Sequence, residues 1–232
     1  MTKLIVALDI AEKNTALKVA KELSPILDWC KVGLELFSIA GPNILQDLKK
    51  LGYNVFLDLK FYDIPNTVSR AVKACTHMGA NILTVHCQGG NKMCIEAVNA
   101  ATQMQEQGYD KPLIFGVTVL TSFGKGEMPG ILKQPMSFAL DLAKMAQDCR
   151  LDGIVCSGQE LDTIRNNTQN LLFLCPGIRP KSSSIGDQKR VVTPYEATQK
   201  GANFLVVGRP ITEAQDPCKA AENILAEINS AL

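Results

Sequence analysis

Two carboxylates and two amines lie at or near the ends of short apolar segments of this 232-residue sequence. Asp58 and Lys60 are two residues apart in one β-prone segment, so in a strand their side chains face the same side. Asp9 and Lys31 lie at the ends of two earlier segments of the same kind. Opposite charges around one ligand keep an amine protonated in a partly buried site, and a fixed ammonium stabilises developing negative charge. The four residues predict an electrostatic site that needs no metal ion.

Two arginines stand just after the last two apolar segments, and each follows a glycine within two residues. Arg179 comes two residues after Gly177, and Arg209 comes directly after Gly208. Glycine lets backbone N–H groups approach an anion, and guanidinium groups bind phosphate oxygens in pairs. The pattern predicts a phosphorylated substrate.

The apolar segments that carry these residues recur regularly and are interpreted as strands. There are eight of them, at 4–8, 29–32, 55–59, 82–85, 113–117, 153–156, 171–175 and 204–207. Amphipathic stretches with helical spacing lie between most of them, and one strand, one helix and two loops repeat about every 29 residues. This pattern favours α/β architecture with parallel strands, a single (β/α)8 TIM barrel that forms one domain over residues 1–232. The chemistry is then expected at the carboxyl ends of the strands.

An open doubly wound sheet is the alternative architecture. It normally has fewer strands and a glycine-rich dinucleotide turn after the first one, and no such turn occurs here. Two long, weakly patterned stretches, 122–134 and 181–190, are typical of binding loops or lids in a compact barrel.

Composition excludes several classes of partner. The chain has 24 basic and 23 acidic side chains, a net charge of +1, so no long-range field favours a nucleic acid or a membrane surface. No apolar run approaches the roughly 18 residues that span a bilayer. The eight cysteines have no metal-ligand spacing, and several lie inside apolar runs. We therefore expect reduced core thiols and a cytoplasmic protein.

A ten-residue run gives the sequence a specific family resemblance. Asp58-Leu59-Lys60-Phe61-Tyr62-Asp63-Ile64-Pro65-Asn66-Thr67 resembles the signature of bacterial-type orotidine 5′-phosphate decarboxylases, although many bacterial members have His where Tyr62 stands. Other landmarks of that family match in order along the whole chain, at 6–9, 31–33, 117–122, 176–180, 186–188 and 207–210.

The resemblance implies removal of CO₂ from C6 of orotidine 5′-phosphate to give UMP, the last step of de novo pyrimidine synthesis, without a cofactor or a metal. By similarity, Lys60 protonates C6 and Asp58 lies against the substrate carboxylate. Lys31 and Asp9 contact the ribose hydroxyls or hold the charge network.

The resemblance also implies substrate-binding residues and a homodimer. Asp63 and Thr67 reach the neighbouring subunit's site. The pyrimidine edge is read by Thr121 and Ser122, and the phosphate is bound by Arg179, Gln188, Gly208 and Arg209.

Two other functions stay open at this point. Metal-dependent phosphosugar decarboxylases and aldolases of the same barrel superfamily share the Asp-x-Lys-x-x-Asp core. A non-catalytic nucleotide-phosphate binder would keep the two arginines but has no reason to keep the four charged residues and Asp63 together. His86, at the end of a predicted strand, is interpreted as a structural residue.

Overall fold

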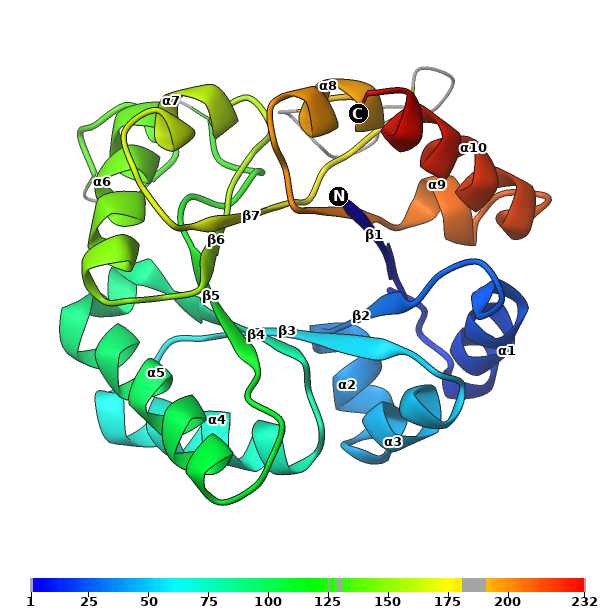
Figure 1. Cartoon of the computed structure of the whole chain (residues 1–232), viewed down its shortest axis with the longest axis horizontal. Coiled ribbons are helices and arrows are strands. Elements are labelled where there is room, and N and C mark those ends of the chain that lie inside the picture. The colour runs from blue at the N-terminus through cyan, green and yellow to red at the C-terminus, as the bar shows by residue number, and fades with distance from the viewer. Residues whose placement is uncertain (1, 125, 129–130, 181–190, 232) are drawn as a thin grey trace.

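Eight parallel strands close into a barrel in the computed structural model, which describes residues 2–124, 126–128, 131–180 and 191–231. The strands follow one another in chain order around the barrel, and β8 pairs with β1 to close it (Figure 1). They are β1 Lys3–Ala7, β2 Trp29–Gly33, β3 Asn54–Phe61, β4 Ile82–His86, β5 Leu113–Val117, β6 Gly153–Val155, β7 Leu172–Cys175 and β8 Phe204–Val207. The predicted (β/α)8 barrel is confirmed.

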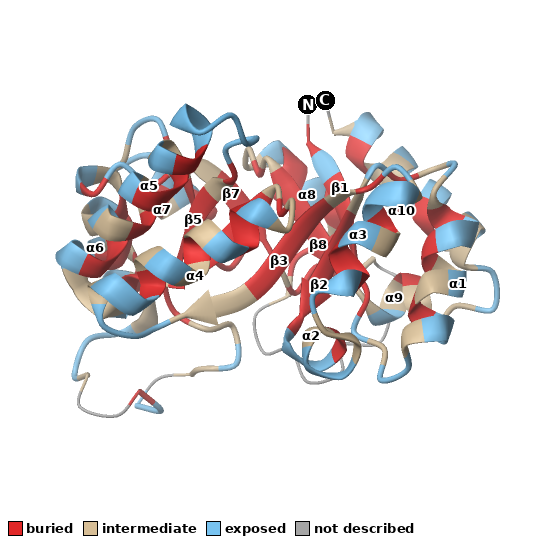
Figure 2. Cartoon of the chain, turned by 90° about the horizontal axis from the view of Figure 1, so that it is seen from below, coloured by how far each residue is buried: buried red, intermediate tan, exposed pale blue. Residues whose placement is uncertain are grey.

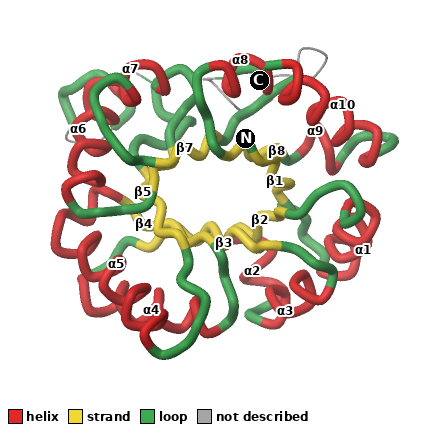
Figure 3. Tube along the Cα trace, viewed as in Figure 1, coloured by secondary structure: helices red, strands yellow, loops and turns green. Residues whose placement is uncertain are grey.

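Helices surround the ring of strands on the outside (Figure 3). They are α1 Lys13–Leu23, α2 Leu34–Ala40, α3 Asn43–Lys50, α4 Pro65–His77, α5 Gly90–Glu106, α6 Pro135–Asp148, α7 Leu161–Arg165, α8 Pro194–Gln199, α9 Arg209–Thr212 and α10 Pro217–Ser230, with the 3₁₀ turn η1 at Cys87–Gly89. The short helices α2, α7 and α9 have one or two turns each, which is too little periodicity to recognise in the sequence. The predicted binding loop 181–190 lies outside the described residues.

The barrel interior is apolar toward the amino ends of the strands and polar at their carboxyl ends. Side chains that point inward alternate along each strand, so Ile5 and Ala7 of β1 lead to Asp9, and Phe56 of β3 leads to Asp58. Aromatic rings fill the barrel interior toward the amino ends of the strands. There Phe204 makes edge contacts with Phe115 and Trp29, with ring centroids 5.9 Å and 5.4 Å apart. The charged side chains at the carboxyl ends of the strands therefore pack on an apolar layer, the apolar floor of the barrel.

A second, larger apolar layer lies between the outer face of the strands and the helices. Figure 2 shows mostly buried strands, with helices that are buried on some faces and exposed on others. Since both faces of the sheet are covered, the strands read as continuous apolar runs rather than alternating ones. All eight cysteines are free thiols, and seven are buried, as expected from the sequence. Among the described helices, none is long and apolar enough to cross a membrane.

Gly153 provides a test of this packing. A Cβ at Gly153 would clash with the carbonyl oxygen of Leu172 and lie 2.5 Å from the Phe115 ring. We expect Gly153→Ala to lower the free energy of unfolding by about 1–3 kcal/mol, because an added methyl overpacks the barrel interior. Urea unfolding at fixed protein concentration measures the loss.

Gly124→Ala is the matched control, because its Cβ would meet only the carboxyl end of the exposed Glu127 side chain, at 3.3 Å. Equal stability of Gly153→Ala and wild type would contradict the packing described here.

Candidate active site

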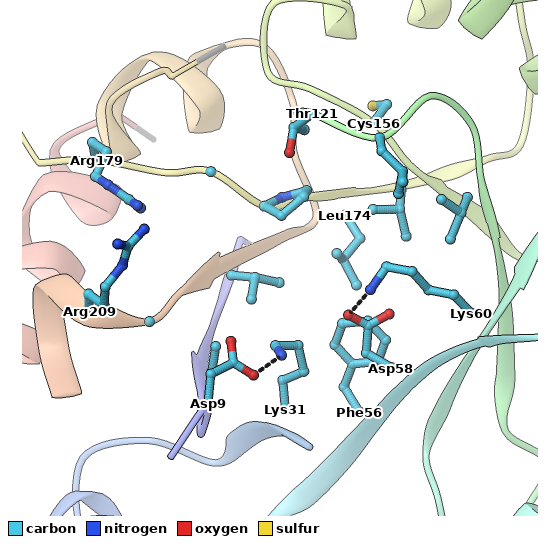
Figure 4. Close-up of a pocket in the computed structure, with 18 of the residues that line it drawn as sticks. Asp9, Lys31, Phe56, Asp58, Lys60, Thr121, Cys156, Leu174, Arg179 and Arg209 are labelled. Atoms are coloured by element: carbon cyan, nitrogen blue, oxygen red, sulfur yellow. Dashed lines mark hydrogen bonds and ion pairs between the residues drawn. The ribbon is translucent and has the colours of Figure 1, made fainter. Parts of the chain in front are cut away.

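A cavity of about 460 Å³ opens at the carboxyl ends of the strands. Residues from different strands and the loops that follow them line it, as expected for a barrel of this kind. It brings together eight of the residues predicted from the sequence, which are Asp9, Lys31, Asp58, Lys60, Thr121, Arg179, Gly208 and Arg209. Figure 4 labels all of them except Gly208 and shows their side chains arranged around the cavity.

Each lysine of the cavity forms an ion pair with one carboxylate. Lys31 Nζ lies 2.6 Å from Asp9 Oδ1, and Lys60 Nζ lies 2.6 Å from Asp58 Oδ2. The Lys31 and Asp58 side chains are only 10% and 12% exposed. Each carboxylate offsets part of the hydration that its lysine loses at the mouth of the barrel.

Lys60 departs from regular strand geometry. Its φ is 51°, in the left-handed region that residues other than glycine rarely adopt. The pairing between β3 and β4 also changes register between Leu57 and Phe61. Strand alternation predicted that Lys60 and Asp58 lie on one face, and the two side chains do meet. The strand is nevertheless irregular at that point.

Two further residues of the site were not predicted as site residues. Gly33 ends β2 directly beside the first ion pair, and a Cβ there would lie 2.8 Å from Lys31 Nζ and 2.9 Å from Asp9 Oδ1. Only glycine leaves both groups in place. Thr84 of β4 contacts the second ion pair, since its hydroxyl lies 3.0 Å from Asp58 Oδ1. The position of Gly33 two residues after a strand-end lysine was a usable signal, but a threonine inside a β-prone run is ordinary.

Arg179 and Arg209 lie opposite Lys60 and are called the arginine wall below. Their guanidinium groups point toward one another across one side of the cavity (Figure 4). Arg179 is buried and donates from Nη1 to the Ile178 carbonyl at 2.9 Å. Burial, and then the charge of Arg209, lower the pKa of the Arg179 guanidinium. A bound dianion would relieve this repulsion, so the wall suits a phosphate group.

Other predicted site residues lie away from this cavity. Asp63 and Thr67 are exposed and do not line it, and Asp63 Oδ1 accepts a hydrogen bond from the Ile64 N–H at 2.7 Å. Ser122 is exposed beyond the cavity lining, and Gln188 lies outside the described residues.

His86 lies at the end of β4, near the second ion pair. Burial lowers the pKa of His86, the charge of Lys60 lowers it further and Asp58 opposes the shift, which leaves the ring neutral at pH 7. Its ring lies 5.6 Å from that of Tyr62 between centroids. The structural role expected for His86 stays a prediction.

The arginine wall makes a direct prediction about anion binding. Inorganic phosphate at about ten times its Kd should raise the Tm by about 3–5 °C at constant ionic strength, because it binds the folded state only. Arg209→Ala should remove most of the shift in a thermal unfolding experiment. Lys111→Ala, which removes one exposed positive charge before the amino end of β5, should leave the shift unchanged. An equal shift in Arg209→Ala and wild type would contradict the assignment.

Comparison with known proteins places this geometry in context. A curated relative from Lawsonia intracellularis, named orotidine 5′-phosphate decarboxylase, is 47% identical over 228 residues, which cover 98% of this chain and 100% of the relative. One of the same name from Maridesulfovibrio salexigens is 45% identical over 232 residues, 99% of this chain and 100% of the relative.

Solved structures with a similar fold include an orotidine 5′-phosphate decarboxylase and an orotidine 5′-monophosphate decarboxylase. The crystal structure of orotidine 5′-phosphate decarboxylase from Lactobacillus acidophilus has a TM-score of 0.84 at 36% identity and covers 99% of this chain and 100% of its own. The enzyme from Methanocaldococcus jannaschii, complexed with the inhibitor BMP, has a TM-score of 0.80 at 25% identity and covers 99% of both chains. The family model described as "Orotidine 5'-phosphate decarboxylase / HUMPS family" matches residues 2–224. The chain belongs to the orotidine 5′-phosphate decarboxylase / HUMPS family.

Proposed function

We propose that this protein decarboxylates orotidine 5′-phosphate to UMP and CO₂, the last step of de novo pyrimidine synthesis, without a metal or a cofactor. The observation that carries the proposal is the Lys60–Asp58 ion pair in the cavity, with an arginine wall on the opposite side. Relatives 42–47% identical over nearly the whole chain carry the name of this enzyme, which supports the same activity here.

Lys60 supplies the proton in the proposed reaction. The bond from C6 to the carboxylate breaks, CO₂ leaves, and the electron pair stays on C6 in an orbital that the ring cannot delocalise. A fixed ammonium beside C6 stabilises this charge and then transfers its proton to C6. The neutral amine of Lys60 then takes a proton from solvent, which restores the ammonium for the next turnover.

Asp58 acts on the same step by charge. It keeps the Lys60 ammonium in place through the 2.6 Å ion pair, and its negative charge beside the substrate carboxylate favours departure of CO₂. We assign the repulsion a smaller part than the ammonium. Asp9 and Lys31, the other ion pair, hold the network or bind the ribose hydroxyls.

Arg179 and Arg209 hold the phosphate on the far side of the cavity from Lys60. Binding energy from this non-reacting group positions the ring against the ammonium.

Lys60→Ala tests the reaction and its acid together. The wild type should convert orotidine 5′-phosphate to UMP in excess EDTA, followed by ultraviolet absorbance. Lys60→Ala should lower kcat by more than about 10³-fold, because it removes both the stabilising charge and the proton donor. Lys111→Ala is the charge-matched control.

Two outcomes would overturn this function. No conversion of orotidine 5′-phosphate by the wild type, together with turnover of a sugar phosphate that stops in EDTA and returns with a divalent metal, would indicate a metal-dependent phosphosugar enzyme of the same superfamily. Binding of UMP without any turnover by the wild type would indicate a nucleotide-phosphate binder.

The functional unit is a two-fold dimer in which Asp63 and Thr67 reach the neighbouring site. Asp63 is exposed, is not among the residues that line its own cavity, and lies between two large exposed side chains, Tyr62 at 62% and Ile64 at 66%. Exposed apolar groups beside a charged residue suit an interface.

Mixed dimers test the placement of Asp63. Co-refolded Lys60→Ala and Asp63→Asn chains should recover about one quarter of wild-type activity, because a mixed dimer has one site with both native residues. Each variant refolded alone is the control. Activity no higher than the mean of the two controls would show that both residues serve one chain's site.

A further inference from the structure

We propose that Thr84 is a positioning residue whose single hydroxyl holds both members of the Lys60–Asp58 pair for the reaction. The proposal rests on the proposed function, in which these two side chains act on C6. Thr84 lies on β4, is fully buried and does not line the cavity. It therefore acts through its neighbours and not on the substrate.

The hydroxyl of Thr84 joins the backbone of one residue to the side chain of the other. Thr84 Oγ1 accepts a hydrogen bond from the Lys60 backbone N–H at 2.9 Å and donates one to Asp58 Oδ1 at 3.0 Å. An amide can only donate and an ionised carboxylate can only accept, so one hydroxyl proton has one orientation that satisfies both. Both distances are within normal hydrogen-bond range.

The bond to the Lys60 amide replaces a missing part of the sheet. The β3–β4 register passes from Leu57↔Leu83 to Phe61↔Val85, so four residue steps on β3 face two on β4. Thr84 lies between the two paired positions of β4 and takes the Lys60 amide with its side chain. An extra segment in one strand breaks the backbone ladder and re-aims side chains.

This bond coincides with the strained backbone of Lys60. A non-glycine residue at φ 51° is strained and persists only where its surroundings hold it. The buried Thr84 hydroxyl is such a restraint. It keeps Lys60 in the conformation from which Nζ reaches Asp58 Oδ2 at 2.6 Å.

The second bond sets the carboxylate plane of Asp58. Thr84 takes Oδ1, which leaves Oδ2 for Lys60 Nζ. Threonine has a stiff χ1, so its Oγ1 holds this position better than a freely rotating group would. The geometry of the acid and of its carboxylate partner thus depends on one buried hydroxyl of a neighbouring strand.

The test compares Thr84→Val, which keeps the shape and removes the hydroxyl, with Thr84→Ser, which keeps the hydroxyl. Thr84→Val should lower kcat about 10- to 100-fold, because small misplacement of a catalytic group is costly. The Kd for UMP should change less than about threefold in both variants, since the arginine wall is untouched. Thr84→Ser should keep kcat within about threefold of wild type.

Thr76→Val is the matched control. Thr76 is also a buried threonine, but its hydroxyl donates to the Val72 carbonyl at 2.8 Å within α4. The kcat of Thr76→Val per folded site, with the sites counted by UMP titration, should equal that of wild type. A kcat loss in Thr76→Val like that in Thr84→Val would show a general packing effect and overturn the proposal.

Amide hydrogen exchange tests the same bond in the wild-type protein and needs no variant. The Lys60 N–H should exchange slowly, because it is bonded to a buried hydroxyl. A fast Lys60 amide, a Thr84→Val kcat near wild type, or equal kcat losses in Thr84→Val and Thr84→Ser would each overturn the proposal. If wild type does not turn over orotidine 5′-phosphate, the proposed function fails, whereas the exchange result still decides whether Thr84 holds Lys60.

Discussion

The pairing of each cavity lysine with one carboxylate is the constraint on which the rest of the site depends. An ammonium taken from water into the mouth of a barrel loses hydration, and a partner at 2.6 Å compensates for that loss. The pairing restricts its neighbours in turn. Gly33 has no Cβ because the Lys31–Asp9 pair occupies that space, and Lys60 adopts a rare φ where its ammonium meets Asp58.

The apolar floor of the barrel makes these restraints possible. Aromatic and branched side chains fill the interior at the amino ends of the strands, so the inward positions at the carboxyl ends are free for polar groups. A densely packed interior resists deformation, and charged groups placed on it keep fixed positions. Preorganised charge of this kind requires little rearrangement during a reaction.

In the proposed function, the site divides into a side that binds the phosphate and a side where the reaction takes place. Arg179 and Arg209 follow β7 and β8, whereas Lys60 and Asp58 belong to β3, and the cavity separates them (Figure 4). Because strands β7 and β8 are joined to β3 through β1 and β2, both sides stand on one closed sheet. In the proposed function, a phosphate held at one side would fix the ring at the other, so that binding energy from a remote group serves the chemistry.

The sequence by itself determined the strand pattern, the barrel and the inward charged positions. Apolar runs in a regular strand–helix repeat are local properties of the chain, and they predicted that Asp9 and Lys31 lie at strand ends on one side of the barrel. The two-residue spacing of Asp58 and Lys60 predicted that they share one face of their strand. Only the tertiary structure decided how Lys60 is held. The register shift between β3 and β4 and the contact of Thr84 with Asp58 join residues 26 apart in the chain, and pairing across strands leaves no local pattern. The role of Gly33 was not predicted for the same reason. Its lack of a side chain matters only because Lys31 Nζ and Asp9 Oδ1 occupy that space in the folded protein.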